Sequence, residues 1–250
     1  MKVIIIAAGY GKRLGKYTKE TPKALVKING MSILDRQIRL LEKEKISKVF
    51  TVIGPNKSKF TNKNFDYIED NYFERHEQLG SLMEARNHFN DDLIILFSDV
   101  LFDQKIISQI TNIECGIGIG IDLNWKKGYE GRTEHPISQA DLVEIKNQKI
   151  IKIQKNLNLN TNNIVGEFIG IIKLSKQSAK EFLNYYENLE KNHIGKFQTA
   201  NSLNKAYLTD ILLDLIDKKY NIMPIMVNGT WCEIDTPQDL EKVERSSIFN

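Results

Sequence analysis

The segment that most constrains the fold is the apolar run Val3-Ile4-Ile5-Ile6-Ala7-Ala8 near the start of the chain. Polar and apolar residues do not alternate in it, which is typical of a strand buried on both faces at the centre of a parallel sheet. A helix is predicted to begin at Ser32, with Asp35 three residues later, and residues 49–53 return as a strand. A strand, a helix and a second strand in this order predict a right-handed crossover and a parallel sheet.

Apolar runs and helical patterns continue to alternate along the chain. Further strands are predicted at residues 93–97, 116–121, 142–145, 150–153 and 168–174. Further helices are predicted at residues 81–89, 104–110, 176–190 and 202–218, and a last one follows Thr236 as N-cap. The expected fold class is α/β: a Rossmann-like open, mostly parallel sheet flanked by helices, with a smaller β-rich insertion lobe. Residues 1–250 are expected to form a single domain, with residues 122–175 as the lobe.

The composition excludes several classes of protein. A formal net charge of +3 on 250 residues gives no support for bulk binding to nucleic acid or membrane. No apolar run approaches the roughly 20 residues that a membrane span needs, and the opening run is too short for a secretory signal. Cys115 and Cys232 lie far apart, without metal-ligand spacing, and are interpreted as buried structural thiols. A cytoplasmic protein without a nucleic-acid or membrane partner is expected.

The loop that leaves the first strand is the first candidate for a binding site, because ligands of open α/β sheets bind outside the carboxyl ends of the strands. It reads Ala7-Ala8-Gly9-Tyr10-Gly11-Lys12-Arg13-Leu14. Its two glycines allow backbone N–H groups to approach an anion, and Arg13 offers a bidentate donor. Leu14 stands where a dinucleotide fingerprint needs a small residue, and Arg13 stands where a Walker loop needs Ser or Thr. A tight turn without a ligand is the alternative.

Basic residues are concentrated after this loop. Six of them are opposed only by Glu20: Lys12, Arg13, Lys16, Lys19, Lys23 and Lys27. Lys23 follows Pro22 and precedes an apolar run, so it is expected to be held in place. The negative charges of a triphosphate must be neutralised from several sides during transfer, which this arrangement could supply. A solvated basic loop is the alternative.

From Ala7 to Lys23 the chain resembles a family of nucleotidyltransferases that opens with Ala-Ala-Gly-x-Gly-x-Arg-Leu, followed by Pro-Lys. The resemblance implies a nucleotidyltransferase domain that joins a nucleoside monophosphate from an NTP to an acceptor and releases pyrophosphate. It implies that Ala7, Ala8, Gly9, Gly11 and Lys12 bind the nucleotide. It further implies that Arg13 and Lys23 are catalytic, and that the insertion lobe binds the acceptor.

Three acidic residues are candidates for a metal site. Asp99 follows the predicted strand at residues 93–97, and Glu233 and Asp235 precede the last helix. In an extended segment, positions 233 and 235 point to one face. Mg²⁺ on triphosphate oxygens takes carboxylate and water ligands, and the resemblance implies that these three residues supply them. A turn-forming role for Asp99 and a helix-capping role for Asp235 remain the alternatives.

The acceptor is suggested by the segment Glu-Ile-Asp-Thr-Pro at residues 233–237. The sugar-phosphate branch of the family usually has Asp-x-Gly-Thr-Pro, so this segment is more similar to cytidylyltransferases acting on phosphocholine or phosphonates. Residues 97–102, 129–136 and 166–170 also resemble nucleotidyltransferase domains of phosphonate biosynthesis. The resemblance implies CTP as donor and a small phosphonate, such as 2-aminoethylphosphonate or 2-hydroxyethylphosphonate, as acceptor. A phosphocholine cytidylyltransferase, a sugar-1-phosphate nucleotidyltransferase and, more remotely, a non-catalytic nucleotide-sensing domain stay open, as does a homodimer.

Four residues are candidates for holding the acceptor. Arg132 and Lys155 could bind its phosphonate, with surface charge as the alternative. Glu167 lies between glycines in an apolar run, where an unpaired carboxylate would be costly, so it could contact a cationic or hydroxylated tail or a neighbouring lysine. His135 is included, although a loop histidine without a role is the alternative.

The resemblance implies that the base is read by the turn Gln78-Leu79-Gly80-Ser81, through Gln78, Gly80 and Ser81. Ser81 could equally be the N-cap of its helix.

Overall fold

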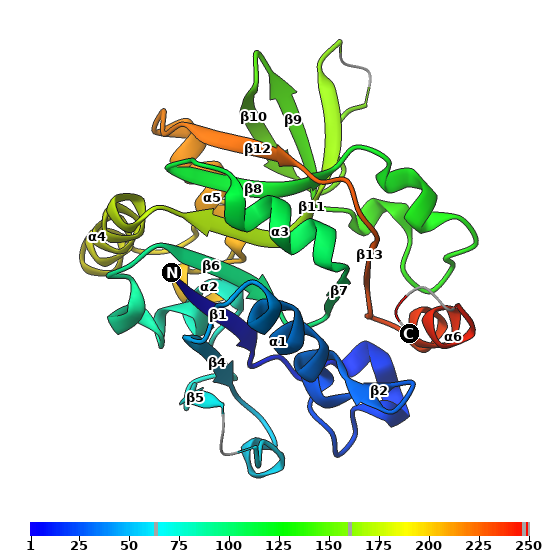
Figure 1. Cartoon of the computed structure of the whole chain (residues 1–250). Coiled ribbons are helices and arrows are strands. Elements are labelled where there is room, and N and C mark those ends of the chain that lie inside the picture. The colour runs from blue at the N-terminus through cyan, green and yellow to red at the C-terminus, as the bar shows by residue number, and fades with distance from the viewer. Residues whose placement is uncertain (63–64, 160–161, 247–248, 250) are drawn as a thin grey trace.

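The computed structural model describes residues 1–62, 65–159, 162–246 and 249, and its centre is one nine-stranded sheet (Figure 1). Strand β1 (Lys2–Ala7) runs parallel to β4 (Val49–Ile53) on one side and to β6 (Leu93–Phe97) on the other. Strand β5 (Asp66–Glu69) extends this parallel half beside β4. The strands predicted at residues 49–53 and 93–97 are therefore confirmed at the same bounds.

The long strand β11 (Ile164–Leu174) joins the parallel half to the other strands. It runs antiparallel to β6, to β8 (Ile117–Asp122) and to β9 (Leu142–Lys146). Strand β10 (Lys149–Gln154) pairs with β9, and β12 (Ile222–Met226) runs parallel to β8. The α/β class with a mostly parallel, Rossmann-like core is confirmed. The strands predicted for the lobe, β9 and β10, extend the central sheet through β11 (top of Figure 1).

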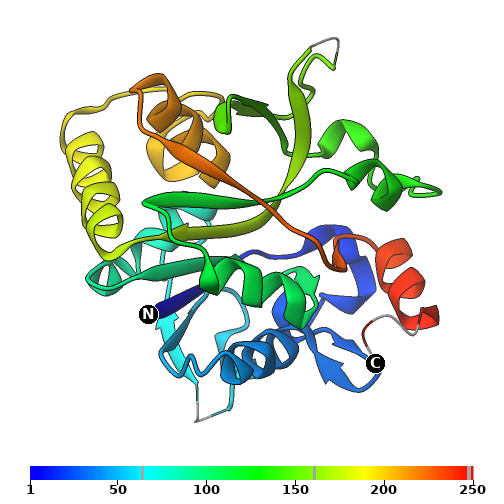
Figure 2. The same cartoon turned by 45° about the horizontal axis from the view of Figure 1, so that its top comes forward.

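Helices cover both faces of the sheet (Figure 2). They are α1 (Ile33–Lys43), α2 (Gln78–Met83), α3 (Gln104–Asn112), α4 (Lys176–Asn192), α5 (Leu208–Asp217) and α6 (Pro237–Arg245). Val3 and Ile5 of β1 enter the core under α1 and α3, whereas Ile4 and Ile6 enter the core under α2, α4 and α5. A strand that feeds two cores needs apolar residues at every position, which explains the uninterrupted run.

The caps predicted for two helices are confirmed. The Ser32 hydroxyl accepts the N–H of Asp35 at the start of α1, and Thr236 forms a capping box with Asp239 at the start of α6. These side chains satisfy N–H groups that the first helical turn leaves without partners.

Two predicted helix starts are wrong. Helix α2 begins at Gln78, so Ser81 lies inside it and is not its N-cap. Residues expected to open the helix at 202 form only a short 3-10 turn, and α5 begins at Leu208. The Asp210 carboxylate accepts the N–H of Tyr207, the N-cap, so the helix begins six residues later than the apolar pattern suggested.

Short elements complete the chain. Strands β2 (Lys27–Ile28) and β3 (Met31–Ser32) form a hairpin, and β7 (Val100–Phe102) pairs antiparallel with β13 (Trp231–Glu233). The 3-10 turns are Lys12–Tyr17, Lys23–Leu25, Lys57–Lys59, Arg86–His88, Trp125–Tyr129, Ile137–Gln139 and Leu203–Lys205. Cys115 and Cys232 are free and only partly buried. Among the described residues, none of the helices combines the length and apolar character required to cross a membrane.

Candidate active site

The glycine loop after β1 is shaped by its contact with the segment around Lys23. Gly11 has φ +62°, and a Cβ placed on it would lie 2.9 Å from Cβ of Lys23. Its carbonyl oxygen accepts the Thr18 hydroxyl at 2.8 Å. A Cβ on Gly9, by contrast, would meet no atom within 4 Å. Gly11 is therefore needed for the backbone of the loop, while Gly9 leaves open space above it.

An ion-pair network lies beside this loop. The ammonium of Lys23 is 2.7 Å from the Asp99 carboxylate and is also bound to Asp235. The guanidinium of Arg13 is 2.8 Å from Asp235, whose side chain is 1% exposed, whereas that of Arg13 is 56% exposed. Lys23 is thus fixed between two carboxylates, as its position beside Pro22 predicted, while Arg13 reaches out from the network toward solvent.

The pairing of β7 with β13 brings the acidic residues together. Glu233 is the register partner of Val100, and the N–H of Ile234 donates to the backbone oxygen of Asp99 at 2.9 Å. Asp99 and Asp235 are therefore close in space, although 136 positions separate them in the sequence. The sequence did not predict this pairing, because both strands have only three residues.

His135 belongs to this centre. It is 4% exposed, and its Nδ1 lies 3.0 Å from Asp235 and 3.9 Å from Glu233. The same nitrogen is 3.4 Å from the Arg13 guanidinium. Positions 233 and 235 thus face one histidine, as expected for an extended segment, and His135 is not an isolated loop residue.

The charges of the network shift its pKa values in opposite directions. Burial alone would lower the pKa of Lys23, but the carboxylates of Asp99, Asp235 and Glu233 outweigh it and raise that pKa. Burial would raise the pKa of Asp235, but His135 and Lys23 hold it well below its usual range. Lys23 and Asp235 are therefore both charged at neutral pH.

Glu233 differs from its neighbours. Burial, followed by the negative charges of Asp235 and Asp99, raises its pKa well above the usual range for a carboxylic acid. A bound cation would reverse this effect, since it would favour the ionised form.

The carboxylates fit a divalent cation. Oδ1 of Asp99 is buried, and no described residue forms a hydrogen bond with it. Ligating atoms of His135, Glu233 and Asp235 all lie within 4.8 Å of one another. Carboxylate oxygens are the ligands that hard cations such as Mg²⁺ prefer, so Asp99, Glu233 and Asp235 could hold such an ion together.

Two cavities meet at the network. The first, of about 530 Å³, lies over the glycine loop and is lined by Ile6, Ala8, Gly9, Tyr10, Gly11, Lys12, Arg13, Lys23, Phe73, Glu74, His76, Glu77, Gln78, Ser81, Phe97, Ser98, Asp99, Lys205, Tyr207 and Asp235. The second, of about 620 Å³, opens toward β10 and β11, and its lining includes His135, Gln139, Asp141, Gln154, Lys155, Glu167, Thr199, Asp210, Trp231 and Glu233. Both cavities are lined by Arg13, Gln78, Phe97, Asp99, Tyr207 and Asp235. Ligands held in the two cavities would therefore face each other across Arg13, Asp99 and Asp235.

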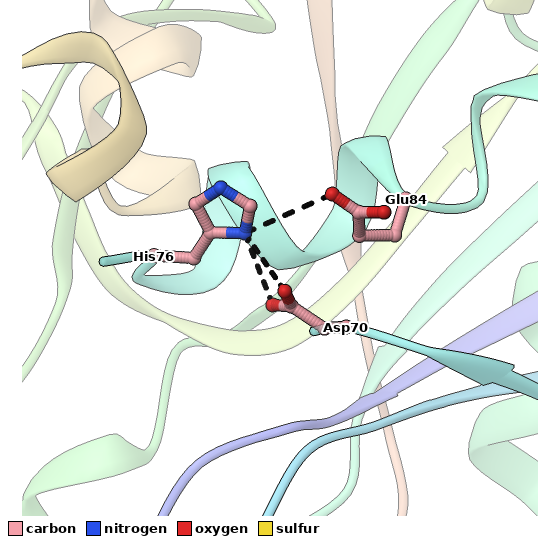
Figure 3. A group of neighbouring side chains, drawn as sticks. All are labelled: Asp70, His76 and Glu84. Carbon is pink, nitrogen blue, oxygen red and sulfur yellow. Dashed lines mark hydrogen bonds and ion pairs between the residues drawn. The ribbon is translucent and has the colours of Figure 1, made fainter. Parts of the chain in front are cut away.

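Asp70, His76 and Glu84 form a cluster of side chains at the end of the first cavity that is lined by α2 (Figure 3). Nδ1 of His76 lies 3.0 Å and 3.1 Å from the two oxygens of Asp70 and 4.0 Å from Glu84. Asp70, which is buried, also accepts the Ser81 hydroxyl at 2.7 Å and the N–H of Tyr72 at 2.9 Å. Asp70 thus fixes the orientation of His76 and Ser81, both of which line the cavity.

The other predicted nucleotide-binding residues lie around the first cavity. Ala8, Lys12 and Gln78 line it. Ala7 is packed in the core beneath the loop, and Gly80 packs against the ring of His76 and the backbone of Asn204. Ala7 and Gly80 therefore do not line the first cavity, and their small size allows close packing behind its wall.

The predicted acceptor residues are divided between cavities. Lys155 is exposed and lines the second cavity, with its ammonium 3.3 Å from Gln139. Glu167 is buried and accepts the hydroxyl of Tyr129. Burial raises its pKa to about 8.

Arg132 lies elsewhere. It donates to both oxygens of Asp239, at 2.6 Å and 2.9 Å, and approaches Glu233 at 3.6 Å. It lines a different cavity, of about 450 Å³. Because its forked donors are used by Asp239, it is better placed to orient the segment before α6 than to hold an acceptor in the second cavity.

Sequence reasoning missed two site residues. Asp70 follows β5 as Asp99 follows β6, but β5 has too few apolar residues for the strand to be recognised. Asp141 precedes a lobe strand and lines the second cavity, and no motif in the sequence marks it.

Comparisons with known proteins agree with this arrangement. Residues 3–113 match the MobA-like NTP transferase domain. The chain is 29% identical over 252 residues to the CTP:phosphoglutamine cytidylyltransferase of Campylobacter jejuni, covering 96% of this chain and 98% of that protein. Its fold is similar to the CTP:phosphocholine cytidylyltransferase of Streptococcus pneumoniae, with a TM-score of 0.72, 18% identity and 97% of each chain covered. It is also similar to the inositol-1-phosphate CTP transferase of T. maritima, with a TM-score of 0.72, 17% identity and 98% and 96% of the two chains covered. Residues 3–113 are therefore similar to a MobA-like NTP transferase domain, and the chain over 96% of its length is similar to a nucleotidyltransferase.

Proposed function

We propose that this protein is a CTP-dependent cytidylyltransferase that joins CMP to a small acceptor carrying a phosphate or phosphonate group. The observation that supports this most strongly is the meeting of two cavities at Arg13, Asp99 and Asp235. A donor triphosphate over the glycine loop and an acceptor on the lobe side would have their reacting groups at that boundary. CTP is favoured as donor because the full-length relative from Campylobacter jejuni is named as a CTP enzyme.

The first cavity would hold CTP with its phosphates over Gly9 and Gly11. Open space above Gly9 would admit an anion close to the backbone N–H groups, and the exposed Arg13 guanidinium could turn toward it. The base would then lie toward α2, near Gln78 and Ser81.

The reaction needs no covalent enzyme intermediate. An ionised oxygen of the acceptor's phospho group attacks the α-phosphorus of CTP, a P–O bond forms, and the bond to the β-phosphate breaks. Pyrophosphate leaves with the electron pair of that bond. Because the attacking oxygen is already deprotonated near neutral pH, a general base is not required.

The residues of the network would lower the barrier by position and charge. Lys23, held by Asp99 and Asp235, would place a fixed positive charge beside the reacting phosphates. Mg²⁺ held by Asp99, Glu233 and Asp235 would supply further neutralisation of the triphosphate when bound. His135, in contact with Asp235, would keep that carboxylate oriented.

Within the phospho-acceptors, a small phosphonate remains our proposal, on the basis of the Glu-Ile-Asp-Thr-Pro segment and the sequence around Glu167. Pyrophosphate release with Mg²⁺ and each of the four ribonucleoside triphosphates would test donor and acceptor together. The acceptors would be 2-aminoethylphosphonate, 2-hydroxyethylphosphonate, phosphocholine and glucose-1-phosphate. Release with CTP and a phosphonate is the expected result. Turnover with glucose-1-phosphate alone would contradict the proposed acceptor, and binding of CTP without any turnover would point to a nucleotide sensor.

A further inference from the structure

Outside the ion-pair network of Lys23, Asp99 and Asp235, the wall of the second cavity contains a carboxylate, Asp141, that has a buried oxygen without a hydrogen-bond partner among the described residues. Asp141 directly precedes β9, and its backbone oxygen accepts the N–H of Phe168 at 2.8 Å, which anchors it to β11. Asp141 lines the cavity and is partly exposed, while its Oδ1 is buried and receives no hydrogen bond from the described part of the chain. A buried carboxylate oxygen without a donor is unfavourable, so its retention calls for a partner.

Neighbouring carboxylates in the same wall have partners. Asp210 accepts the N–H and hydroxyl of Thr199, at 3.1 Å and 2.6 Å, and the N–H of Tyr207 at 2.8 Å. Glu167 accepts the hydroxyl of Tyr129. Asp210 and Glu167 are thus explained by contacts within the protein, and Asp141 is not.

The charges around Asp141 do not neutralise it. Burial is the largest influence and raises its pKa to about 6. Lys155 and His135 favour its ionised form, while the negative charges of Asp210 and Asp235 oppose it. Lys155 is exposed and hydrogen-bonded to Gln139, so its ammonium is not fixed on Asp141.

We propose that Asp141 binds an ammonium group of the acceptor, so that the substrate is a small phospho compound that also carries a primary amine. This inference rests on the proposed function of the same site. The phospho group would lie at the boundary with the first cavity, near Arg13, and the amine would lie against β9. A zwitterionic acceptor of this kind matches a cavity that has Arg13 and Lys155 as well as a free carboxylate in its wall.

Three chemical classes can be distinguished at Asp141. A hydroxyl could donate a hydrogen bond but would leave the buried charge unbalanced. A quaternary ammonium would balance the charge but has no N–H to donate. A primary ammonium does both, so it fits Asp141 better than a sugar hydroxyl or a choline head group.

The test compares matched acceptors on the whole protein. 2-Aminoethylphosphonate and 2-hydroxyethylphosphonate differ in an ammonium against a hydroxyl, and phosphoethanolamine and phosphocholine differ in three N–H groups that are N-methyl groups in phosphocholine. Wild-type protein should show kcat/KM about tenfold or more higher for the primary amine of each pair, as expected for a charged hydrogen bond. Asp141→Asn should remove this preference by lowering kcat/KM for the amines alone.

The control is Glu144→Gln. It removes a carboxylate from β9 itself, but Glu144 accepts a hydrogen bond from Asn163 at 2.7 Å and does not line the second cavity. Its amine preference should equal that of wild type. Equal rates for both members of each pair in wild type would overturn the inference, as would an equal loss for both in Asp141→Asn.

Binding separates this inference from the proposed function. Calorimetric titration of each acceptor into protein saturated with Mg²⁺ and a nonhydrolysable CTP analogue needs no turnover. Amine-selective binding that requires Asp141, without turnover of any acceptor, would support the inference and contradict the transferase proposal. Turnover with binding that does not discriminate the amines would do the reverse.

Discussion

The ammonium of Lys23 lies 2.7 Å from the carboxylate of Asp99, although 76 positions separate the two residues in the chain. Lys23 belongs to the loop after β1 and Asp99 to the turn after β6, and these strands are direct neighbours in the sheet. The carboxyl ends of parallel neighbours meet at one edge, so the sheet itself brings a cation and a metal-ligand candidate together. The first two predictions concern these residues.

Replacement of Lys23 by alanine should lower kcat by about 100-fold or more, because a fixed positive charge at the reacting phosphates is lost. The variant should also be less stable without Mg²⁺, since Asp99 and Asp235 lose their shared partner. Steady-state pyrophosphate release and thermal unfolding would measure the two effects. Lys19→Ala removes an exposed lysine of the same basic segment and should leave kcat unchanged. Similar kcat values for the two variants would contradict the role of Lys23.

Replacement of Asp99 by asparagine should weaken Mg²⁺ binding about tenfold or more, since a charged oxygen ligand is exchanged for a neutral one. Titration of activity with Mg²⁺ would show a higher half-saturating concentration and a lower maximum. Removal of the metal with a chelator should abolish turnover of the wild type. It should also raise the pKa of Glu233, because the cation that favours the ionised carboxylate is lost. Unchanged Mg²⁺ dependence in Asp99→Asn would show that Asp99 is not a ligand.

The two glycines of the loop should respond differently to alanine. Gly11→Ala should lower the free energy of unfolding by about 1–3 kcal/mol, because its backbone has positive φ and the new Cβ would meet Lys23. Gly9→Ala should leave stability nearly unchanged, since a Cβ there meets no atom within 4 Å, but should raise KM for CTP by occupying the space above the loop. Denaturant unfolding and initial rates would separate the effects. Equal stability losses would contradict this account of the loop.

Asp141 should make stability depend on pH. Burial raises its pKa from 3.8 to about 6, so the folded protein holds this proton more tightly than the unfolded chain does. The stabilisation that comes from binding this proton is therefore fully present below pH 3.8 and is lost as pH rises through about 6. Relative to wild type, Asp141→Asn should gain about 1–3 kcal/mol of unfolding free energy between pH 4 and pH 8. Parallel stability curves for the two proteins would show that Asp141 is not an unpaired buried acid.

Asp70→Asn should loosen the end of the first cavity near α2. Asp70 holds Ser81, Tyr72 and His76, and an amide at that position cannot accept all of these hydrogen bonds. KM for CTP should rise about tenfold while kcat changes less, as expected for lost nucleotide positioning. Glu84→Gln changes a group 4.0 Å from His76 and is the matched control. An equal rise in KM for both variants would argue against a specific role for Asp70.

The parallel core could be predicted because Val3, Ile4, Ile5 and Ile6 form an uninterrupted apolar run, and this local pattern indicates a strand buried on both faces. The helix starts at residues 81 and 202 could not be placed in the same way. Both true starts lie where two distant segments meet: the N–H of Glu77 donates to the backbone oxygen of Asn204, and the N–H of Leu79 to that of Ala206. Apolar periodicity contains no information about such contacts.

The candidate site was predictable to the extent that its residues follow strands. Asp99 was found from its place after a buried run, and Lys23 from its place beside Pro22. The convergence of His135 on Asp235 was not predictable, because it depends on a loop of the lobe folding back on β13. The unpaired state of Asp141 depends on every neighbour that fails to reach it, which only the three-dimensional structure reveals.

³¹P NMR of a reaction containing CTP, Mg²⁺ and 2-aminoethylphosphonate would detect the proposed products themselves. Pyrophosphate and a phosphonate–CMP anhydride should appear in equal amounts, and both should form more slowly with Lys23→Ala and with Asp99→Asn than with wild type. Phosphate or pyrophosphate without the anhydride, or unchanged CTP with each of the tested phospho-acceptors, would contradict the proposed function.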